Sequence, residues 1–363
     1  MSVKAKKGVA DIPIFIPAKS IEAVREELGK KEIIKLSANE NRLGYSPKIP
    51  EALKKEAGKL NIYPDVGCPV LREAVAGHHG IRDDRILFGN GLFEVILLIA
   101  QAYVDSGDEV LVPETTFGWY ATASLHEDAV VKKIPLKNFE IDLNAITDAI
   151  TDRTKIVWLC NPNNPTGRLI PETDLEDFLR KVPEDVLVVI DEAYIDFAPE
   201  NYRDAVHFIE QYDNLVVLRT FSKLYGLAAL RIGYALANED IIENLTKVKQ
   251  PLNVNANSQI AAKVSLEDRE FKQKVQENNR KGLQMYYDTF KKWKLQYIES
   301  FANFLLVNIE TDSGRVEQEL MQEGILLRNG KRFNYDGWLR ITVGTYEDNV
   351  TVIKALGRIL GKK

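Results

Sequence analysis

A lysine next to a serine, with an arginine shortly after, offers the clearest chemistry in this sequence. Lys223 directly follows Ser222, and Arg231 lies eight residues further along the chain. A lysine amine forms imines with aldehydes, while a hydroxyl and a guanidinium can together hold a phosphate dianion. The three side chains therefore suit a cofactor that carries both an aldehyde and a phosphate. Because a basic residue near a Ser-Lys pair also arises by chance, the pattern needs support from elsewhere in the chain.

Two turns upstream provide such support, and each follows an apolar run that is typical of a buried strand. Residues 156–160 lead into Asn161-Pro-Asn-Asn-Pro-Thr-Gly167, and residues 186–190 lead into Asp191-Glu-Ala-Tyr194. Both turns are expected at the carboxyl ends of strands in a parallel sheet. Taken alone, the first could be only a rigid turn, and Asp191 could cap a helix or pair with an arginine.

A fourth cluster, Gly89-Asn90-Gly91, precedes the helical run of residues 92–100. Free amides and the positive helix end there would bind phosphate, although an ordinary helix start has the same sequence. The four clusters together supply what pyridoxal phosphate requires. These requirements are a lysine for the imine, an acid opposite the pyridine nitrogen, donors for the phenolic oxygen, a phosphate site and an aromatic face.

With these motifs, the chain resembles the histidinol-phosphate aminotransferase family, within the fold-type I pyridoxal-phosphate aminotransferases. The resemblance extends from about Ile14 to Leu360. Its most specific part is Arg219-Thr-Phe-Ser-Lys-Leu-Tyr-Gly-Leu-Ala-Ala-Leu-Arg-Ile-Gly-Tyr234, which departs from the family mainly at Ala229, where a glycine is usual. The Asn-Pro-Thr-Gly and Asp-Glu-Ala-Tyr motifs are almost as specific.

The resemblance implies a role for each residue that would bind the cofactor. Lys223 would form the imine and move the substrate proton, Asp191 would pair with the pyridine nitrogen, and Tyr194 would bond the phenolic oxygen together with Asn164. Phe117 would stack on the ring, although core packing is its other interpretation. The phosphate would be held by the backbone near Gly91 and Leu92 and by Thr220, Ser222 and Arg231. Tyr63 would reach the phosphate of a neighbouring subunit, which implies an obligate homodimer.

The resemblance also implies a pocket for the anionic end of the substrate. Arg328 and Arg340 would bind it, and Arg340 would also take the carboxylate of glutamate, because a guanidinium fork suits both anions. Arg328 could instead be a surface residue at a strand end. The remaining positions expected in this pocket are Phe15, Asn39 and Asn164.

Four positions depart from the family pattern around this pocket. Phe15 stands where a tyrosine is usual, Arg42 where a proline is usual, and Leu92-Phe93 where a Ser-Asp pair is usual. Phosphate binding by backbone amides would survive the last change, because every residue except proline has an amide. The departures affect the expected substrate more than the expected cofactor.

The expected activity is a reversible transfer of an amino group between glutamate and histidinol phosphate, in two half-reactions. A broader aromatic amino-acid aminotransferase is the first alternative, because Phe15 and Leu92-Phe93 make the pocket more apolar. A phosphoamino-acid decarboxylase is a second. A catalytically silent pyridoxal-binding regulator is a third, although such proteins usually carry a fused DNA-binding domain and none is expected before Ile14.

Composition agrees with a globular enzyme that binds small molecules. The chain has 363 residues, 45% hydrophobic and 28% charged, with a net charge of −5, so we expect neither nucleic-acid nor membrane partners. No secretory signal or long apolar run is evident, which predicts a cytoplasmic protein. Cys68 and Cys160 lack metal-ligand spacing, so no metal is expected and both are expected to be free thiols.

Strand-like and helical runs alternate along the chain, which predicts an α/β fold with a second, smaller α+β domain. The predicted strands are residues 86–88, 109–112, 130–134, 156–159, 186–190, 215–218 and 232–236, in one mostly parallel seven-stranded sheet. The large domain would span residues 45–255. Residues 1–44 and 256–363 would form the small domain, entered through a long helix at residues 265–293.

Overall fold

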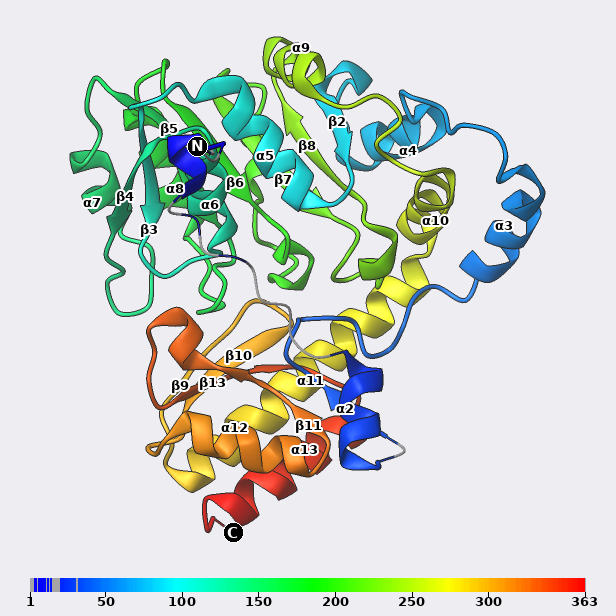
Figure 1. Cartoon of the computed structure of the whole chain (residues 1–363), viewed down its shortest axis with the longest axis vertical. Coiled ribbons are helices and arrows are strands. Elements are labelled where there is room, and N and C mark those ends of the chain that lie inside the picture. Colours follow the sequence, from blue (N-terminus) through cyan, green and yellow to red (C-terminus); the bar gives the residue numbers. More distant parts are fainter. Residues whose placement is uncertain are drawn as a thin grey trace.

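The computed structural model describes residues 3–4, 6–10, 12, 14, 20–30 and 32–362. A larger α/β unit and a smaller unit lie one above the other, and the 25-residue helix α11 (Arg269–Trp293) runs along the smaller one (Figure 1). No helix in these described ranges is long and apolar enough to cross a membrane.

The larger unit is built on a seven-stranded sheet with the strand order β2-β8-β7-β6-β5-β3-β4. β8 runs antiparallel to both neighbours, and every other adjacent pair is parallel. The predicted mostly parallel seven-stranded sheet is therefore confirmed, and each predicted strand overlaps an observed one. The strands are β2 (Ile86–Gly89), β3 (Glu109–Pro113), β4 (Val130–Ile134), β5 (Thr154–Cys160), β6 (Leu187–Asp191), β7 (Leu215–Thr220) and β8 (Gly233–Ala237).

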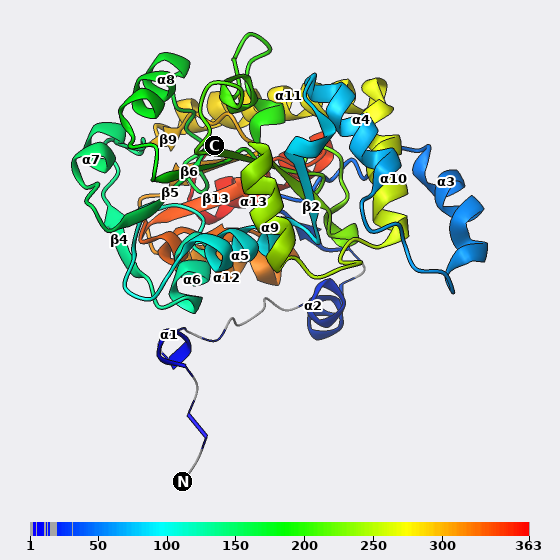
Figure 2. The same cartoon turned by 90° about the horizontal axis from the view of Figure 1, so that it is seen from above.

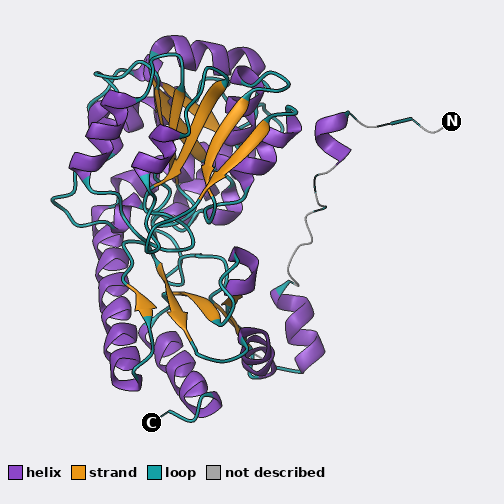
Figure 3. Ribbon diagram, turned by 90° about the vertical axis from the view of Figure 1, so that its left-hand side faces the viewer, coloured by secondary structure: helices purple, strands orange, loops and turns teal. Residues whose placement is uncertain are grey.

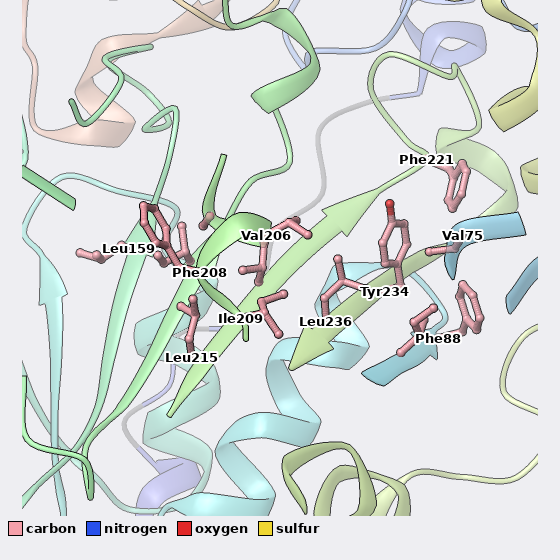
Figure 4. Close-up of a cluster of buried hydrophobic side chains, with 14 of the residues drawn as sticks. Val75, Phe88, Leu159, Val206, Phe208, Ile209, Leu215, Phe221, Tyr234 and Leu236 are labelled. Atoms are coloured by element: carbon pink, nitrogen blue, oxygen red, sulfur yellow. The ribbon is translucent and has the colours of Figure 1, made fainter. Parts of the chain in front are cut away.

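Helices cover both faces of this sheet, as Figure 3 shows. One face carries α5 (Leu92–Tyr103), α6 (Trp119–His126) and α9 (Glu239–Val248), and the other carries α4 (Pro69–His79), α8 (Glu172–Lys181) and α10 (Ala256–Glu267). Because helices bury the central strands on both sides, the side chains on both faces of the sheet are apolar. Figure 4 shows part of the core on the face that carries α4, α8 and α10, with Phe88, Phe208 and Tyr234. The remaining helices of this unit are α3 (Ile49–Glu56) and α7 (Leu143–Asp148).

Side-chain alternation along the central strands decides which polar residues face which core. Val189 packs in the core under α5 and α6, so Asp191, two residues later, faces the same side, whereas Glu192 turns to the other. The same alternation on β7 separates Thr220 from Arg219. As a result, Arg219 pairs with Glu192 at 2.9 Å on one face, and the opposite face holds Asp191 and Thr220.

The smaller unit contains a four-stranded antiparallel sheet in the order β12-β13-β10-β9. Its strands are β9 (Tyr297–Ile298), β10 (Phe304–Asn308), β12 (Arg328–Asn329) and β13 (Trp338–Thr342), and its core is formed with α11, α12 (Ser313–Gln322) and α13 (Tyr346–Ile359). The N-terminal part of the chain joins this unit through β1 (Ile34–Lys35), which pairs in parallel with β11 (Ile325–Leu326).

In the described part of the N-terminal region, two short helices precede β1. α2 (Ile21–Leu28) begins at Ser20, whose hydroxyl accepts a hydrogen bond from Ala23 N at 3.1 Å. α1 (Lys7–Ala10) lies beside α6 of the larger unit (Figure 2), and Lys7 there forms an ion pair with Asp128 at 3.6 Å.

The predicted helix at residues 265–293 is wrong in one respect, because Asp268 divides it into α10 and α11. The Asp268 carboxylate caps α11 by accepting a hydrogen bond from Phe271 N at 3.4 Å. α10 contributes Ala261 and Ala262 to the core of the larger unit. The proposed domain boundary at residues 255 and 256 stays a prediction, and the packing of α10 favours a boundary closer to Asp268.

Candidate active site

The carboxyl ends of β5, β6 and β7 border a cavity of about 190 Å³. Three larger hollows in the described part of the chain, of about 500, 590 and 390 Å³, contain none of the predicted site residues. Because parallel strands end at one edge of a sheet, residues distant in sequence meet in the smaller cavity. The predicted residues that line it are Leu92, Phe117, Asn164, Asp191, Tyr194, Thr220, Ser222, Lys223 and Arg231.

Lys223 lies in the loop after β7 and points its amine into this cavity. Nζ donates a hydrogen bond to the Ala38 carbonyl at 3.2 Å and lies 5.7 Å from the centre of the Tyr194 ring. Burial, assisted by the positive charge of Arg340, lowers the pKa of the amine to about 8. A substantial neutral fraction is therefore available near neutral pH, which a nucleophilic amine requires.

Asp191 ends β6 and is almost completely buried. Its Oδ2 accepts a hydrogen bond from the Tyr120 hydroxyl at 2.7 Å, and its Oδ1 accepts one from Ala193 N at 3.0 Å. Burial raises the pKa of the carboxyl to about 6, while these two donors and Lys223 oppose the rise. Above that pH the cavity holds a desolvated anion, which would attract a protonated ring nitrogen.

Tyr194 and its neighbours form a hydrogen-bonded group on the side of the cavity that faces the smaller unit. The Tyr194 hydroxyl oxygen accepts bonds from Asn39 Nδ2 at 3.0 Å and from Asn164 Nδ2 at 3.4 Å. Burial raises the pKa of this hydroxyl, so the group stays protonated and can donate into the cavity. Asn39 is itself fixed by Thr342, whose hydroxyl donates to Asn39 Oδ1 at 3.0 Å.

The start of α5 and the loop after β7 form a positively charged end of the cavity. Arg231 donates through Nη1 to the Ala228 carbonyl at 3.1 Å, and its backbone has a φ of 53°. Gly91 lies against this guanidinium, since a Cβ there would come within 2.1 Å of Arg231 Nη2. A side chain at this position would displace the guanidinium, so glycine leaves room for the arginine to lie over the helix N-terminus, where both favour an anion.

Arg340 and Arg328 lie opposite each other on β13 and β12, at the edge of the smaller unit. Arg340 donates to Asn164 Oδ1 at 2.6 Å and to the Ser37 carbonyl at 2.8 Å, and its guanidinium lies 5.2 Å from the ring centre of Phe304. Arg328 Nε donates to the same carbonyl at 3.2 Å. Burial lowers the pKa of Arg340 to about 10, so it remains charged at neutral pH.

The structure does not bring every predicted residue into the cavity. Tyr63 is 83% exposed on the segment between α3 and α4, and Phe15 lies outside the described residues. Asn39 and Arg340 are bonded to the lining residues Tyr194 and Asn164 without being part of the lining themselves. Arg328 lies one step further out, on the Ser37 carbonyl beside Arg340. The roles assigned to all these residues stay predictions.

Seven lining residues were not among the predicted site residues, and three of these have polar side chains: Tyr120, Cys160 and Glu40. The other four are Ala38, Phe93, Ala193 and Ala228. Tyr120 could have been suspected from sequence, because a tyrosine buried in a helix usually needs a partner for its hydroxyl. Cys160 is buried, and its thiol donates to the Pro162 carbonyl at 3.3 Å. Glu40 forms an ion pair with Lys35 at 2.8 Å.

The residues that depart from the family pattern lie in different surroundings. Arg42 makes a two-pronged ion pair with Asp348, through Nε at 2.9 Å and Nη2 at 3.1 Å. Phe93 lines the cavity and packs edge-to-face on Phe117, with ring centres 5.5 Å apart. Ala229 is an exposed residue of a single helical turn, where nothing requires a glycine conformation.

The chain is similar to known proteins over nearly its whole length. Residues 31–356 match the family described as aminotransferase class I and II. A curated histidinol-phosphate aminotransferase from Moorella thermoacetica is 41% identical over 359 residues, covering 98% of this chain and 93% of the relative. One of the same name from Brevibacillus brevis is 39% identical over 359 residues, covering 99% of each chain.

A solved structure supports the fold independently. The crystal structure of histidinol-phosphate aminotransferase from Sinorhizobium meliloti in complex with pyridoxal-5'-phosphate superposes with a TM-score of 0.91. The superposition covers 99% of this chain and 98% of the other, at 24% identity. At this identity, the likeness concerns the fold alone.

Proposed function

Because this chain belongs to the aminotransferase class I and II family, we propose that it is a pyridoxal-phosphate-dependent aminotransferase that acts on histidinol phosphate. The observation that carries the proposal is the presence of Lys223, Asp191 and Arg231 in one cavity. Asp191 comes from the end of β6, whereas Lys223 and Arg231 come from the loop after β7. The three side chains match the acid, amine and phosphate-binding groups that this cofactor requires.

The donor set of the cavity fits pyridoxal phosphate at each of its ends. Arg231, Ser222 and the start of α5 would hold the phosphate, Asp191 would face the pyridine nitrogen, and Tyr194 would donate to the phenolic oxygen. The Gly91 position supports this assignment, because the absence of a Cβ there leaves room for the Arg231 guanidinium. When bound, the cofactor supplies an electron sink for the carbanion that forms when a substrate loses its Cα proton.

The residues of the chain supply the proton transfer and the binding of substrate. With a pKa of about 8, the Lys223 amine can take up and return a proton near neutral pH. Arg340 is fixed by Asn164 and the Ser37 carbonyl, so its fork is already in place for a carboxylate. Arg340 and the neighbouring Arg328 would together bind either the carboxylate of glutamate or the phosphate of histidinol phosphate.

One feature favours a second candidate, an aminotransferase for aromatic amino acids. Phe93 forms part of the cavity lining and lies on Phe117 and Trp119, so this side of the pocket is more apolar than a Ser-Asp pair would make it. A phosphoamino-acid decarboxylase on the same scaffold would differ in product, because it would release CO₂.

A homodimer and a cytoplasmic location are further parts of the proposal. The first comes from the resemblance and the second from the pattern of the sequence. Tyr63 supports the first, because a tyrosine that is 83% exposed would find a partner in the site of another subunit. Each site would then be built from two chains.

The test is turnover of the purified enzyme, loaded with pyridoxal phosphate, with glutamate or 2-oxoglutarate as the second substrate. We expect a kcat/KM for histidinol phosphate at least about a hundredfold above that for phenylalanine, because only the phosphate engages both arginines. A preference for phenylalanine would favour the second candidate, and CO₂ release would favour the decarboxylase. Lys223→Ala should abolish turnover, and an active Lys223→Ala enzyme would overturn the proposal.

A further inference from the structure

A continuous row of aromatic rings runs from the core of the larger unit to the cavity. Trp158 on β5 stacks on Tyr120 of α6 with ring centres 5.2 Å apart and an interplanar angle of 6°. Tyr120 then meets the edge of Phe117 at 5.4 Å, and Phe117 meets Phe93 at 5.5 Å. The Tyr120 ring is therefore held on both sides and is fully buried.

This fixed ring directs its hydroxyl at the acid of the site. The hydroxyl donates to Asp191 Oδ2 at 2.7 Å, while Ala193 N holds the other oxygen at 3.0 Å. Both carboxylate oxygens thus have a donor that cannot turn away, one from a stacked ring and one from the backbone. A phenylalanine would fill the same space, so packing alone gives no reason for a hydroxyl at this place.

We propose that Tyr120 is a positioning residue, which keeps the Asp191 carboxylate charged and oriented towards the ring nitrogen of the cofactor. The inference rests on the proposed cofactor, and it assigns Tyr120 a role through Asp191 without direct contact with substrate. A hydrogen bond to a charged acceptor is about twice as strong as one between neutral groups, so Tyr120 stabilises the ionised form of Asp191 selectively.

The electrostatic surroundings of Asp191 make this effect measurable. Burial raises the pKa of Asp191, and Tyr120 is the strongest of the influences that lower it. The other titratable groups that face Asp191 are Lys223 from the loop after β7, Cys160 from β5, and Tyr194 from the segment after β6. Burial raises the pKa of both Cys160 and Tyr194, so Asp191 and Lys223 are the groups of this set that titrate near neutral pH.

The experiment measures the affinity of the apoenzyme for pyridoxal phosphate between pH 5 and 8.5, for the wild type and Tyr120→Phe. A protonated Asp191 must lose its proton before it can pair with a protonated ring nitrogen. We therefore expect the acid side of the affinity profile to move to higher pH in Tyr120→Phe, with affinity at pH 6.5 about tenfold lower. A purely structural role would lower the affinity equally at all pH values.

Tyr286→Phe is the matched control, because Tyr286 is also fully buried and donates one hydrogen bond, to Asn349 Oδ1 at 3.1 Å, in the smaller unit. It should leave the profile unchanged. The effect of Tyr120→Phe should also disappear in an Asp191→Asn background, where no carboxylate remains to be stabilised.

If Tyr120→Phe does not fold, 3-fluorotyrosine incorporated at position 120 gives a nearly isosteric, more acidic donor. It should move the acid side of the profile to lower pH. An unshifted profile in either variant, with normal binding by the wild type, would overturn the inference alone. No binding of pyridoxal phosphate by the wild type would overturn the proposed function and this inference with it.

Discussion

At the scale of single residues, the acid of the site is a source of instability in the protein without cofactor. Asp191 is buried, and its pKa of about 6 lies above the ordinary value of 3.8. The folded state therefore binds this proton more tightly than the unfolded state. Ionisation of Asp191 therefore lowers the free energy of unfolding. This stability is lost progressively as the pH rises from about 4 to 6, and the full loss is present above pH 6. The difference between these two pKa values corresponds to at most about 3 kcal/mol of unfolding free energy.

Asp191→Asn should remove this cost, because an amide oxygen can still accept from Ala193 N and the amide NH₂ can face the Tyr120 hydroxyl. We expect the urea midpoint of the apoprotein to rise at pH 8 and to change little at pH 4. In the presence of pyridoxal phosphate the order should reverse at pH 8, because only the wild type binds the cofactor tightly. Equal midpoints of the two apoproteins at pH 8 would contradict this account.

At the scale of secondary-structure elements, Asp268 connects the start of α11 to the segment that leads from the N-terminal region into α3. Its carboxylate caps α11 and accepts bonds from the Ser46 hydroxyl and from Lys48 Nζ, the latter at 3.1 Å. Burial alone would raise the pKa of Asp268, but these donors hold it below its ordinary value. Two chain segments that connect the larger and the smaller unit, one leading into α3 and one leading into α11, therefore meet at the Asp268 side chain.

Asp268→Ala should destabilise the protein by about 2–3 kcal/mol at pH 7, because it removes a helix cap and leaves Ser46 without its acceptor. The pKa of Asp268 is lower in the folded than in the unfolded protein, so its full contribution to stability is present above the unfolded pKa near 4. This contribution is lost as the pH falls through the folded pKa. The difference in urea midpoint from the wild type should therefore shrink in acid. Asp142→Ala, which removes a cap from α7 only, should cost about 1 kcal/mol. An equal effect of the two substitutions would contradict a connecting role for Asp268.

At the scale of the whole molecule, an apolar segment lies exposed at the outer edge of the larger unit, between α3 and α4 (Figure 1). It consists of Leu60, Ile62, Tyr63 and Val66, and Val70 in the first turn of α4 continues it; all five are exposed. Exposed apolar groups of this kind mark interaction surfaces. A second copy of the chain is the partner that the predicted role of Tyr63 implies.

We expect the purified protein to sediment as a dimer, and the double substitution Leu60→Glu and Ile62→Glu to shift it towards monomer by placing charges in the interface. Affinity for pyridoxal phosphate should fall in parallel, because Tyr63 would then no longer reach the neighbouring site. Val130→Glu introduces a charge at another exposed apolar position, on β4, and should leave sedimentation unchanged. A wild type that sediments as a monomer would refute the predicted assembly.

Much of the site was predictable because it lies in short motifs at strand ends. Lys223, Asp191, Asn164 and Arg231 were predicted from sequence and line one cavity, since each follows a strand whose apolar run and turn are visible in the sequence. The family and the seven-stranded sheet were also predicted and are confirmed. Helix α11 was predicted with its C-terminal end correct but not its start, because a single buried aspartate does not interrupt a helical pattern.

The sequence by itself therefore determined the strands, their polar ends and the chemistry those ends could perform, because local patterns specify them. Only the tertiary structure decided which groups surround them. The hydrogen bond from Tyr120 to Asp191, the contact of Gly91 with Arg231 and the pairing of Arg42 with Asp348 join residues far apart in the chain. Such contacts depend on how helices pack on the sheet and how the two units meet. The same packing removes water from Asp191 and Lys223, and this desolvation sets their pKa values.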